Sequence, residues 1–166
     1  MLDSFQGLPV HALIVHATVV MVPTAALVVA LASVYPRFRS WIGIGMPVAA
    51  VVALILVPLS TESGDKLKDH IDPGPPARVA ELIHEHEELA DTLLWYVLPL
   101  VVVAVVGYLL HRRGNVSTTL TAVVAVVSIA LGAATIVDVA RIGHAGAKAA
   151  WDGTTNLDHG NAPSSK

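Results

Sequence analysis

The 166-residue chain contains no cysteine, which excludes disulfide bonds, thiolate metal sites and covalent c-type haem attachment. Charged residues are scarce as well, at 14% of the chain against about 25% in an average soluble domain. The net charge of -3 comes with no basic stripe, so nothing indicates a nucleic-acid partner. Hydrophobic residues make up 54% of the sequence, with a mean hydropathy of +0.67. This composition predicts an integral membrane protein.

The sequence lacks the residues that several kinds of function require. The middles of the second, third and fourth apolar segments carry no ionisable residue, so a proton or ion pathway through the molecule lacks its usual parts. No nucleophile with a positioned base and no phosphate loop is present. Three methionines without cysteine make a poor Cu(I) site. An electron carrier or accessory membrane protein is therefore expected rather than an enzyme.

Four segments are long and apolar enough to cross a bilayer. They predict an all-α fold, an integral membrane four-helix bundle formed by residues 1–151. Pro36 is expected to end the first helix in a short basic turn, with Trp41 as an interface anchor at the start of the second. The polar residues 152–166 predict a flexible tail. The expected spans are about 9–34, 41–59, 89–110 and 118–139.

The loops predict how the bundle is oriented. The turns at 35–40 and 111–115 carry positive charge and no acidic residue, which places both turns in the cytoplasm. The 60–91 connection is acidic and is expected outside. Both termini then lie outside as well, in a multi-pass protein of the bacterial cell membrane. The arginines that carry this prediction are Arg37, Arg39, Arg112 and Arg113.

The third helix is predicted to extend beyond the outer membrane face over about residues 76–88. From Val79 onward its apolar residues recur at helical spacing, and His86 falls on that stripe. His84 lies about 200° away among acidic residues. We therefore expect His86 to face the bundle and His84 to face solvent.

Four histidines from three helices converge on the outer membrane boundary: His11, His16, His86 and His144. Neutral imidazole is a good ligand for haem iron, zinc and copper, and bundle interiors are where such sites are built. The leading interpretation is a b-type haem (heme b) near the outer face, held by two of the four and serving electron transfer or redox sensing. His16 and His86 are the expected ligands. His11 or His144 would form a second pair or bond the propionates.

Two alternatives stay open. The same imidazoles, with Asp138 nearby, could bind Zn²⁺ or Cu²⁺ without haem, with His16 and His86 as the metal ligands. Alternatively the chain is a cofactor-free structural subunit of a membrane complex, whose histidines fix helix ends or sense pH. Asp138 and Arg141, three residues apart, predict either a helical ion pair or groups that orient a ligating histidine.

Several sequence blocks together resemble the bacterial membrane family called domain of unknown function 2231 (DUF2231), in its actinobacterial form. That family consists of small four-helix membrane proteins and also occurs fused to cytochrome-like domains. The fusion implies a redox context and a partner protein on the outer side. Whether the chain forms a homo-oligomer stays open. The resemblance selects the same four histidines and adds Thr61, Ser63 and Gly64. This chain departs from the family pattern at Ala12, Ala90 and Ala145. The blocks that carry the resemblance are Gly7 to His16, Thr61 to Asp65, His86 to Asp91, and Arg141 to Ala147 with Trp151.

Overall fold

The computed structural model describes residues 4–5, 8–68 and 75–159, and the side chains of 10–68 and 75–152. The described chain is almost wholly α-helical, as the sequence predicts. Two very short antiparallel strands precede the first helix. The elements in chain order are β1 (Ser4–Phe5), β2 (Leu8–Pro9), α1 (Val10–Val34), α2 (Pro36–Ile42), α3 (Gly45–Lys68), α4 (Ala77–Arg113) and α5 (Thr118–His159).

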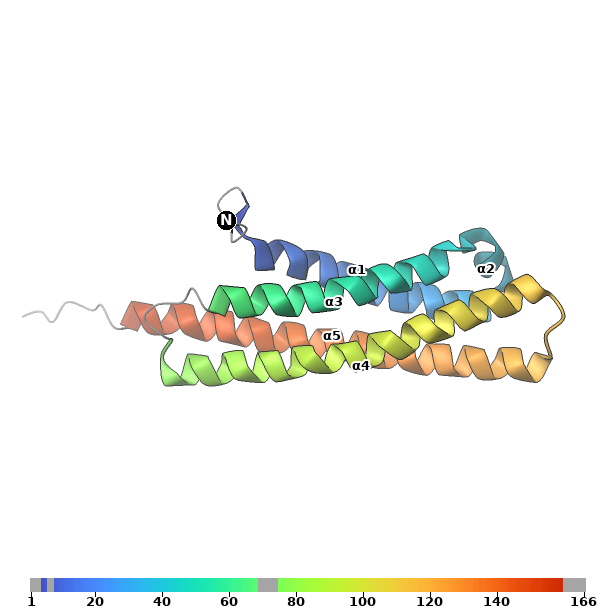
Figure 1. Cartoon of the computed structure of the whole chain (residues 1–166). Helices are drawn as coiled ribbons and strands as arrows, with labels where there is room; N and C mark the ends of the chain where they lie inside the picture. Colours follow the sequence, from blue (N-terminus) through green and yellow to red (C-terminus); the bar gives the residue numbers. More distant parts are fainter. Residues whose placement is uncertain (1–3, 6–7, 69–74, 160–166) are drawn as a thin grey trace, which may run out of the picture.

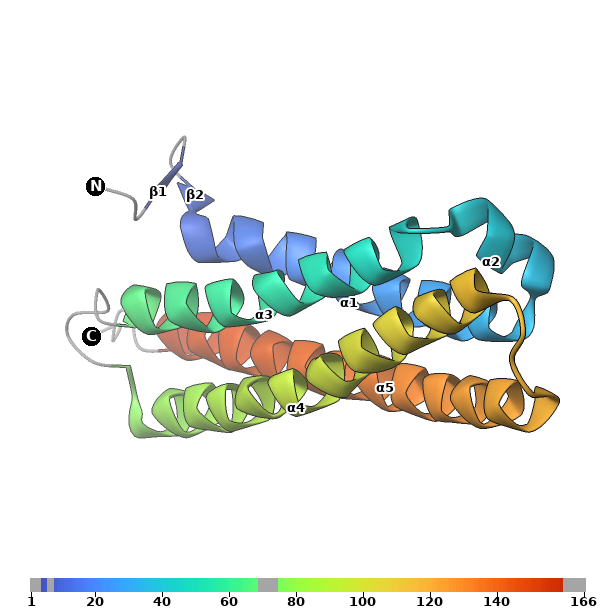
Figure 2. The same cartoon turned by 45° about the vertical axis from the view of Figure 1, so that its right-hand side comes forward.

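The four long helices run side by side as one elongated bundle (Figures 1 and 2). Helix α3 packs against α1 and α4, and α5 packs against the same two helices, so α1 and α4 occupy diagonal positions. We call the end of the bundle that holds His11, His86 and His144 the histidine end. The opposite end, with α2 and the α4–α5 connection, is the arginine end.

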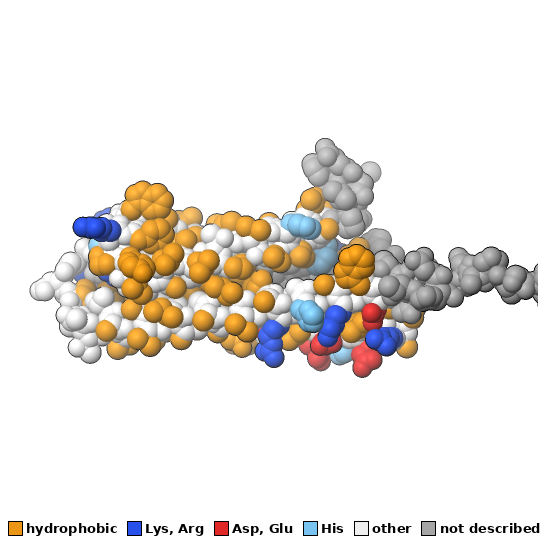
Figure 3. All heavy atoms as spheres, turned by 180° about the vertical axis from the view of Figure 1, so that it is seen from behind, with side chains coloured by type: hydrophobic (Ala, Val, Ile, Leu, Met, Phe, Trp, Pro, Cys, Tyr) orange, Lys and Arg blue, Asp and Glu red, His pale blue; other side chains and the backbone are white. Residues whose placement is uncertain are grey.

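All four long helices are long and apolar enough to cross a membrane. Large hydrophobic side chains point outward along the bundle, among them Val20 at 63% and Val126 at 67% exposure. Figure 3 shows this apolar surface over most of the length, with acidic side chains gathered at the histidine end. A surface of this kind needs lipid around it, so the fold is that of a multi-pass membrane protein.

The basic segment after α1 is a helix rather than the short turn that the sequence predicted. Pro36 stands at the start of α2, where its missing N–H costs nothing. The helix ends at Gly43, whose φ of 51° is a conformation that glycine adopts without strain. Trp41 therefore belongs to α2, 77% exposed and near Phe38, and the second span begins at Gly45.

Two helices continue past their predicted ends. The second span was expected to end near residue 59, but α3 runs to Lys68, and the hydroxyls of Thr61 and Ser63 bond carbonyls within their own helix. Helix α5 continues through residues 152–159, which were expected in the tail, and its Asp152 pairs with Arg78 at 3.0 Å. The rest of the predicted tail lies outside the described residues.

Helix α4 is continuous over 37 residues, as expected, and is about 55 Å long at 1.5 Å per residue. The hydrocarbon core of a bilayer is about 30 Å thick. Since α4 can tilt by only a modest angle within a packed bundle, part of it must extend beyond the lipid. The predicted stripe faces inward, with Val79, Leu93 and Leu100 buried.

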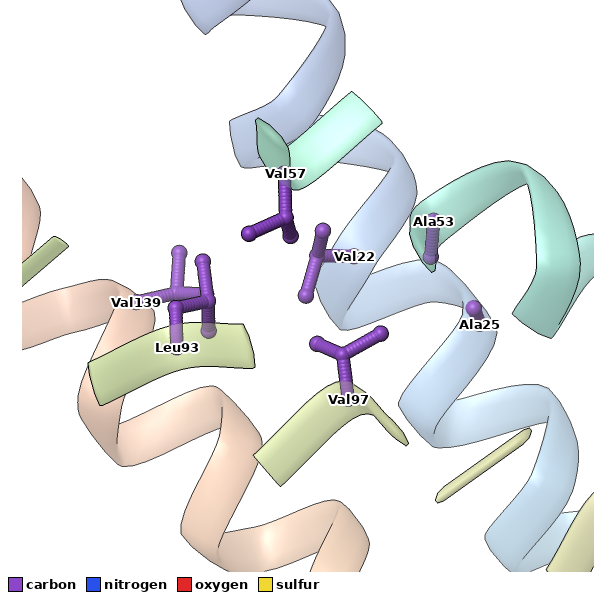
Figure 4. Close-up of a cluster of buried hydrophobic side chains, with 7 residues drawn as sticks. All are labelled: Val22, Ala25, Ala53, Val57, Leu93, Val97 and Val139. Atoms are coloured by element: carbon purple, nitrogen blue, oxygen red, sulfur yellow. The ribbon is translucent and has the colours of Figure 1, made fainter. Parts of the chain in front are cut away.

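Small and β-branched side chains fill the bundle interior. The helices approach closely enough that a Cβ built on Gly132 of α5 would lie 3.1 Å from the Ala26 carbonyl oxygen of α1. Proline occurs within α1, α3 and α4, at Pro23, Pro58 and Pro99. One core cluster, drawn in Figure 4, draws on all four long helices: Val22, Ala25, Ala53, Val57, Leu93, Val97 and Val139.

Candidate functional site

His11 is anchored across the bundle to α3. Its Nδ1 lies 3.0 Å from the Ser63 hydroxyl oxygen, and that hydroxyl donates its own hydrogen to the Ser60 carbonyl at 2.9 Å. A Ser63 hydroxyl that donates to this carbonyl can only accept from His11, which assigns the hydrogen of the ring to Nδ1. The neutral imidazole therefore has its free lone pair on Nε2.

His86 is anchored in the same way, to α5. Its Nδ1 lies 3.1 Å from the Ile142 carbonyl oxygen. A carbonyl can only accept, so Nδ1 carries the hydrogen and Nε2 carries the lone pair. A ring nitrogen that donates to a carbonyl or hydroxyl, leaving the other free, is the arrangement that metal-binding histidines use.

Two glycines make room for these rings. A Cβ at Gly64 would lie 3.2 Å from the His11 ring, and a Cβ at Gly146 would lie 3.0 Å from the His86 ring. Either substitution would force the ring to move, because real Cβ atoms rarely approach other atoms this closely. Each imidazole therefore lies against a helix backbone that bears no side chain at that position.

The two anchored rings lie at the same end of the bundle. His11 is on α1 and His86 is on α4, the diagonal pair, and both face the interior at the histidine end. Diagonal helices that each present one imidazole to the bundle axis are a suitable framework for a group bound between them.

The other two histidines of the predicted set lie elsewhere. His16 is exposed, and its Nδ1 bonds the Ala12 carbonyl of its own helix. Five residues place it about 140° around α1 from His11, so the two cannot share a face. His144 is also exposed, in a groove between α4 and α5. The contacts thus anchor His11 and His86 to neighbouring helices at the same end of the bundle, whereas His16, one of the two expected ligands, is exposed.

His84 faces solvent, as predicted, with its Nε2 3.4 Å from Glu88. Thr61, which the family resemblance added, donates to the Pro58 carbonyl of its own helix and contacts none of the histidines through a hydrogen bond in the described residues. Ser63, added in the same way, is the residue that anchors His11.

Asp138 is buried, at 5% exposure, in the interior between α4 and α5. It accepts from the Thr92 hydroxyl at 3.2 Å and 3.3 Å. The expected helical ion pair with Arg141 does not form among the described residues, although the two charges interact at longer range. Arg141 is exposed because its position on α5 turns it outward, toward the groove that holds His144.

The described residues contain no group of three or more histidine, cysteine or acidic side chains arranged to hold a metal ion. A structural zinc site takes four protein ligands and a catalytic one takes three. A haem with two axial histidines takes only two, and the His11 and His86 pair supplies that number.

The sequence did not indicate Gly146 or the Ile142 carbonyl, although both define the position of His86. The sequence block that contains both residues was singled out for His144 instead. A signal was nevertheless present, because glycine within a helix costs about 1 kcal/mol relative to alanine and so calls for a packing reason. Thr92, the partner of Asp138, gave no signal because a threonine in an apolar segment is unremarkable.

The fold and this site define a multi-pass, four-helix membrane protein with paired interior histidines. The chain belongs to the family described as "Predicted membrane protein (DUF2231)", which matches residues 7–158. This match confirms the resemblance drawn from the histidine-containing blocks. No curated protein and no solved structure matches the chain.

Proposed function

We propose that this protein binds a b-type haem through His11 and His86 and serves electron transfer or redox sensing at the outer face of the bacterial cell membrane. The observation that supports this most strongly is the contact that each ring makes through Nδ1. Each donates from Nδ1, to Ser63 or to the Ile142 carbonyl, and each keeps the lone pair of Nε2 for a ligand.

The residues around the pair have distinct tasks in this proposal. Ser63 and the Ile142 carbonyl hold the rings in orientation and make Nε2 more basic, which strengthens a bond to iron. Gly64 and Gly146 leave room for each ring beside a helix backbone. The haem, when bound, supplies one-electron exchange, which would serve a redox partner on the outer side.

The visible spectrum tests the proposal directly. Full-length protein, purified in mild detergent and supplied with haem, should show the Soret band and the sharp α band of a six-coordinate, low-spin haem. His11→Ala and His86→Ala should each remove the low-spin spectrum, because one axial ligand is lost. His16→Ala and His84→Ala are matched controls and should leave the spectrum unchanged, since both rings face outward.

Other outcomes separate the alternatives. The absence of a Soret band after haem supplementation would exclude haem binding. Stoichiometric zinc or copper in the purified protein, lost in His11→Ala, would assign the pair to a non-haem metal instead. Protein that carries neither, and that keeps its stability and partner binding in the double variant, would be a cofactor-free accessory subunit.

The proposed orientation can be tested because the chain has no cysteine of its own. Glu81→Cys, on the exposed face of α4, should react with a membrane-impermeant maleimide in intact cells. Asn115→Cys, in the connection at the arginine end, should react only after the cells are opened. The reverse pattern would place the histidine end in the cytoplasm.

A further inference from the structure

A groove of about 460 Å³ opens between α4 and α5 at the histidine end, separate from the interior histidine pair. One wall is the outer face of α5, where Arg141, His144 and Lys148 follow one another at helical spacing. The three side chains are exposed, and the described residues offer none of them a hydrogen bond or an ion pair. The single acidic group in the groove is Glu85 of α4. The groove therefore carries a net positive charge.

The rest of the groove is apolar. Leu89 of α4 and Val137 and Ala140 of α5 line it on the side toward the middle of the bundle. Val137 is 57% exposed, and the α5 surface continues from there as apolar side chains. Residues 137 to 148 span about 16 Å along the helix. Over that distance the surface changes from one that suits an acyl chain to one that suits an anion.

We propose that this groove is a binding site for an anionic phospholipid. The phosphate would lie between Arg141 and His144, with Lys148 above it, and an acyl chain would pass over Leu89 and Val137. Arginine pairs with phosphate through two parallel N–H donors, and lysine supplies a second positive charge at the membrane surface. The groove lies where a lipid head group must lie, because the charged and apolar parts of α4 and α5 meet there.

This assignment gives His144 and Arg141 a task that differs from cofactor binding. Both lie outside the bundle, so a lipid reaches them from the bilayer without any opening of the interior. The site is independent of the haem proposal: it would operate equally in a protein that binds no cofactor.

Lipid binding by the full-length protein in detergent can be counted by native mass spectrometry. Titration with phosphatidylglycerol and phosphatidylcholine of equal chain length should show about tenfold tighter binding of phosphatidylglycerol. Arg141→Gln combined with Lys148→Gln should reduce the two affinities to the same value. Lys68→Gln combined with Arg78→Gln removes the same charge at the same end, outside the groove, and should keep the preference.

Three results would overturn the proposal. Equal affinity of the wild-type protein for the two lipids would mean that the groove does not select charge. Loss of the preference in the Lys68 and Arg78 control as well would mean that the total charge of this end selects the lipid. Displacement of phosphatidylglycerol by inorganic phosphate at the same concentration would mean that the acyl chain contributes nothing. Thermal unfolding of both double variants verifies that they are folded.

Discussion

Gly132→Leu should prevent the four-helix bundle from assembling. A Cβ at this position would lie 3.1 Å from the Ala26 carbonyl oxygen and 3.6 Å from the Ala30 Cβ, and a leucine adds three more carbons. The neighbour is backbone, which cannot rotate away as a side chain can, so α1 and α5 must separate. Overpacking of a core costs about 1–3 kcal/mol, and we expect at least the upper value here. Size-exclusion chromatography and thermal unfolding in detergent would measure the loss.

Gly143→Leu is the matched control, because it makes the same change on the same helix. Nothing lies within 4 Å of a Cβ at that position. Leucine is a better helix former than glycine by up to about 1 kcal/mol, so this variant should be at least as stable as the wild type. Equal destabilisation of the two variants would show that close α1–α5 contact is not what holds the bundle together.

Gly146→Leu should remove cofactor binding while the bundle stays folded. Its Cβ would lie 3.0 Å from the His86 ring, and the larger side chain would occupy the space of the imidazole. The ring would then lose the Ile142 carbonyl and leave the interior. Loss of a group that orients a ligand weakens metal binding by about 10–100-fold, and displacement of the ligand itself should reach the upper value. Haem titration followed by the Soret band would measure it.

The smaller substitution, Gly146→Ala, distinguishes an effect on the position of the His86 ring from a general disturbance of the fold. Gly146→Ala should leave the haem bound but shift its reduction potential, because the ring moves by only a few tenths of an ångström. Gly143→Ala, three residues away in open space, should change neither potential nor affinity. An unaltered spectrum in Gly146→Leu would mean that His86 is not a ligand.

The helical architecture could be predicted from the sequence because each span can be recognised from its own residues. Length and apolarity identify four spans, and the inward position of His86 follows from its place on the stripe that begins at Val79. The ends of helices were harder to predict. Polar residues such as Ser63 looked like a loop because, without the fold, nothing indicates that a hydroxyl bonds its own helix. Residues 35–40 looked like a turn because one proline and two arginines are compatible with either structure.

The site was predictable only in part, for a geometric reason. The spacing of residues along α1 shows that His11 and His16 lie on different faces, but not which face meets α3. That depends on how the helix is rotated within the bundle, which is set by long-range contacts such as Thr18 with the Leu56 carbonyl at 3.4 Å. The sequence therefore predicted His11 and His86 among the candidates at the histidine end, but it also included His16 and His144, which the structure places on the outside.

The prolines in α1 and α4 bear on how a bulky group could enter the interior. Pro23 and Pro99 each lack the N–H that would bond the carbonyl four residues earlier, at Val19 and Trp95, so both helices have a weak point near mid-length. These are the two diagonal helices that carry His11 and His86. Each proline thus lies between a segment that carries a histidine and a segment that contributes a buried alanine to the core, Ala26 in α1 or Ala104 in α4. Both diagonal helices therefore lack a backbone hydrogen bond at the boundary between their histidine-bearing half and their other half.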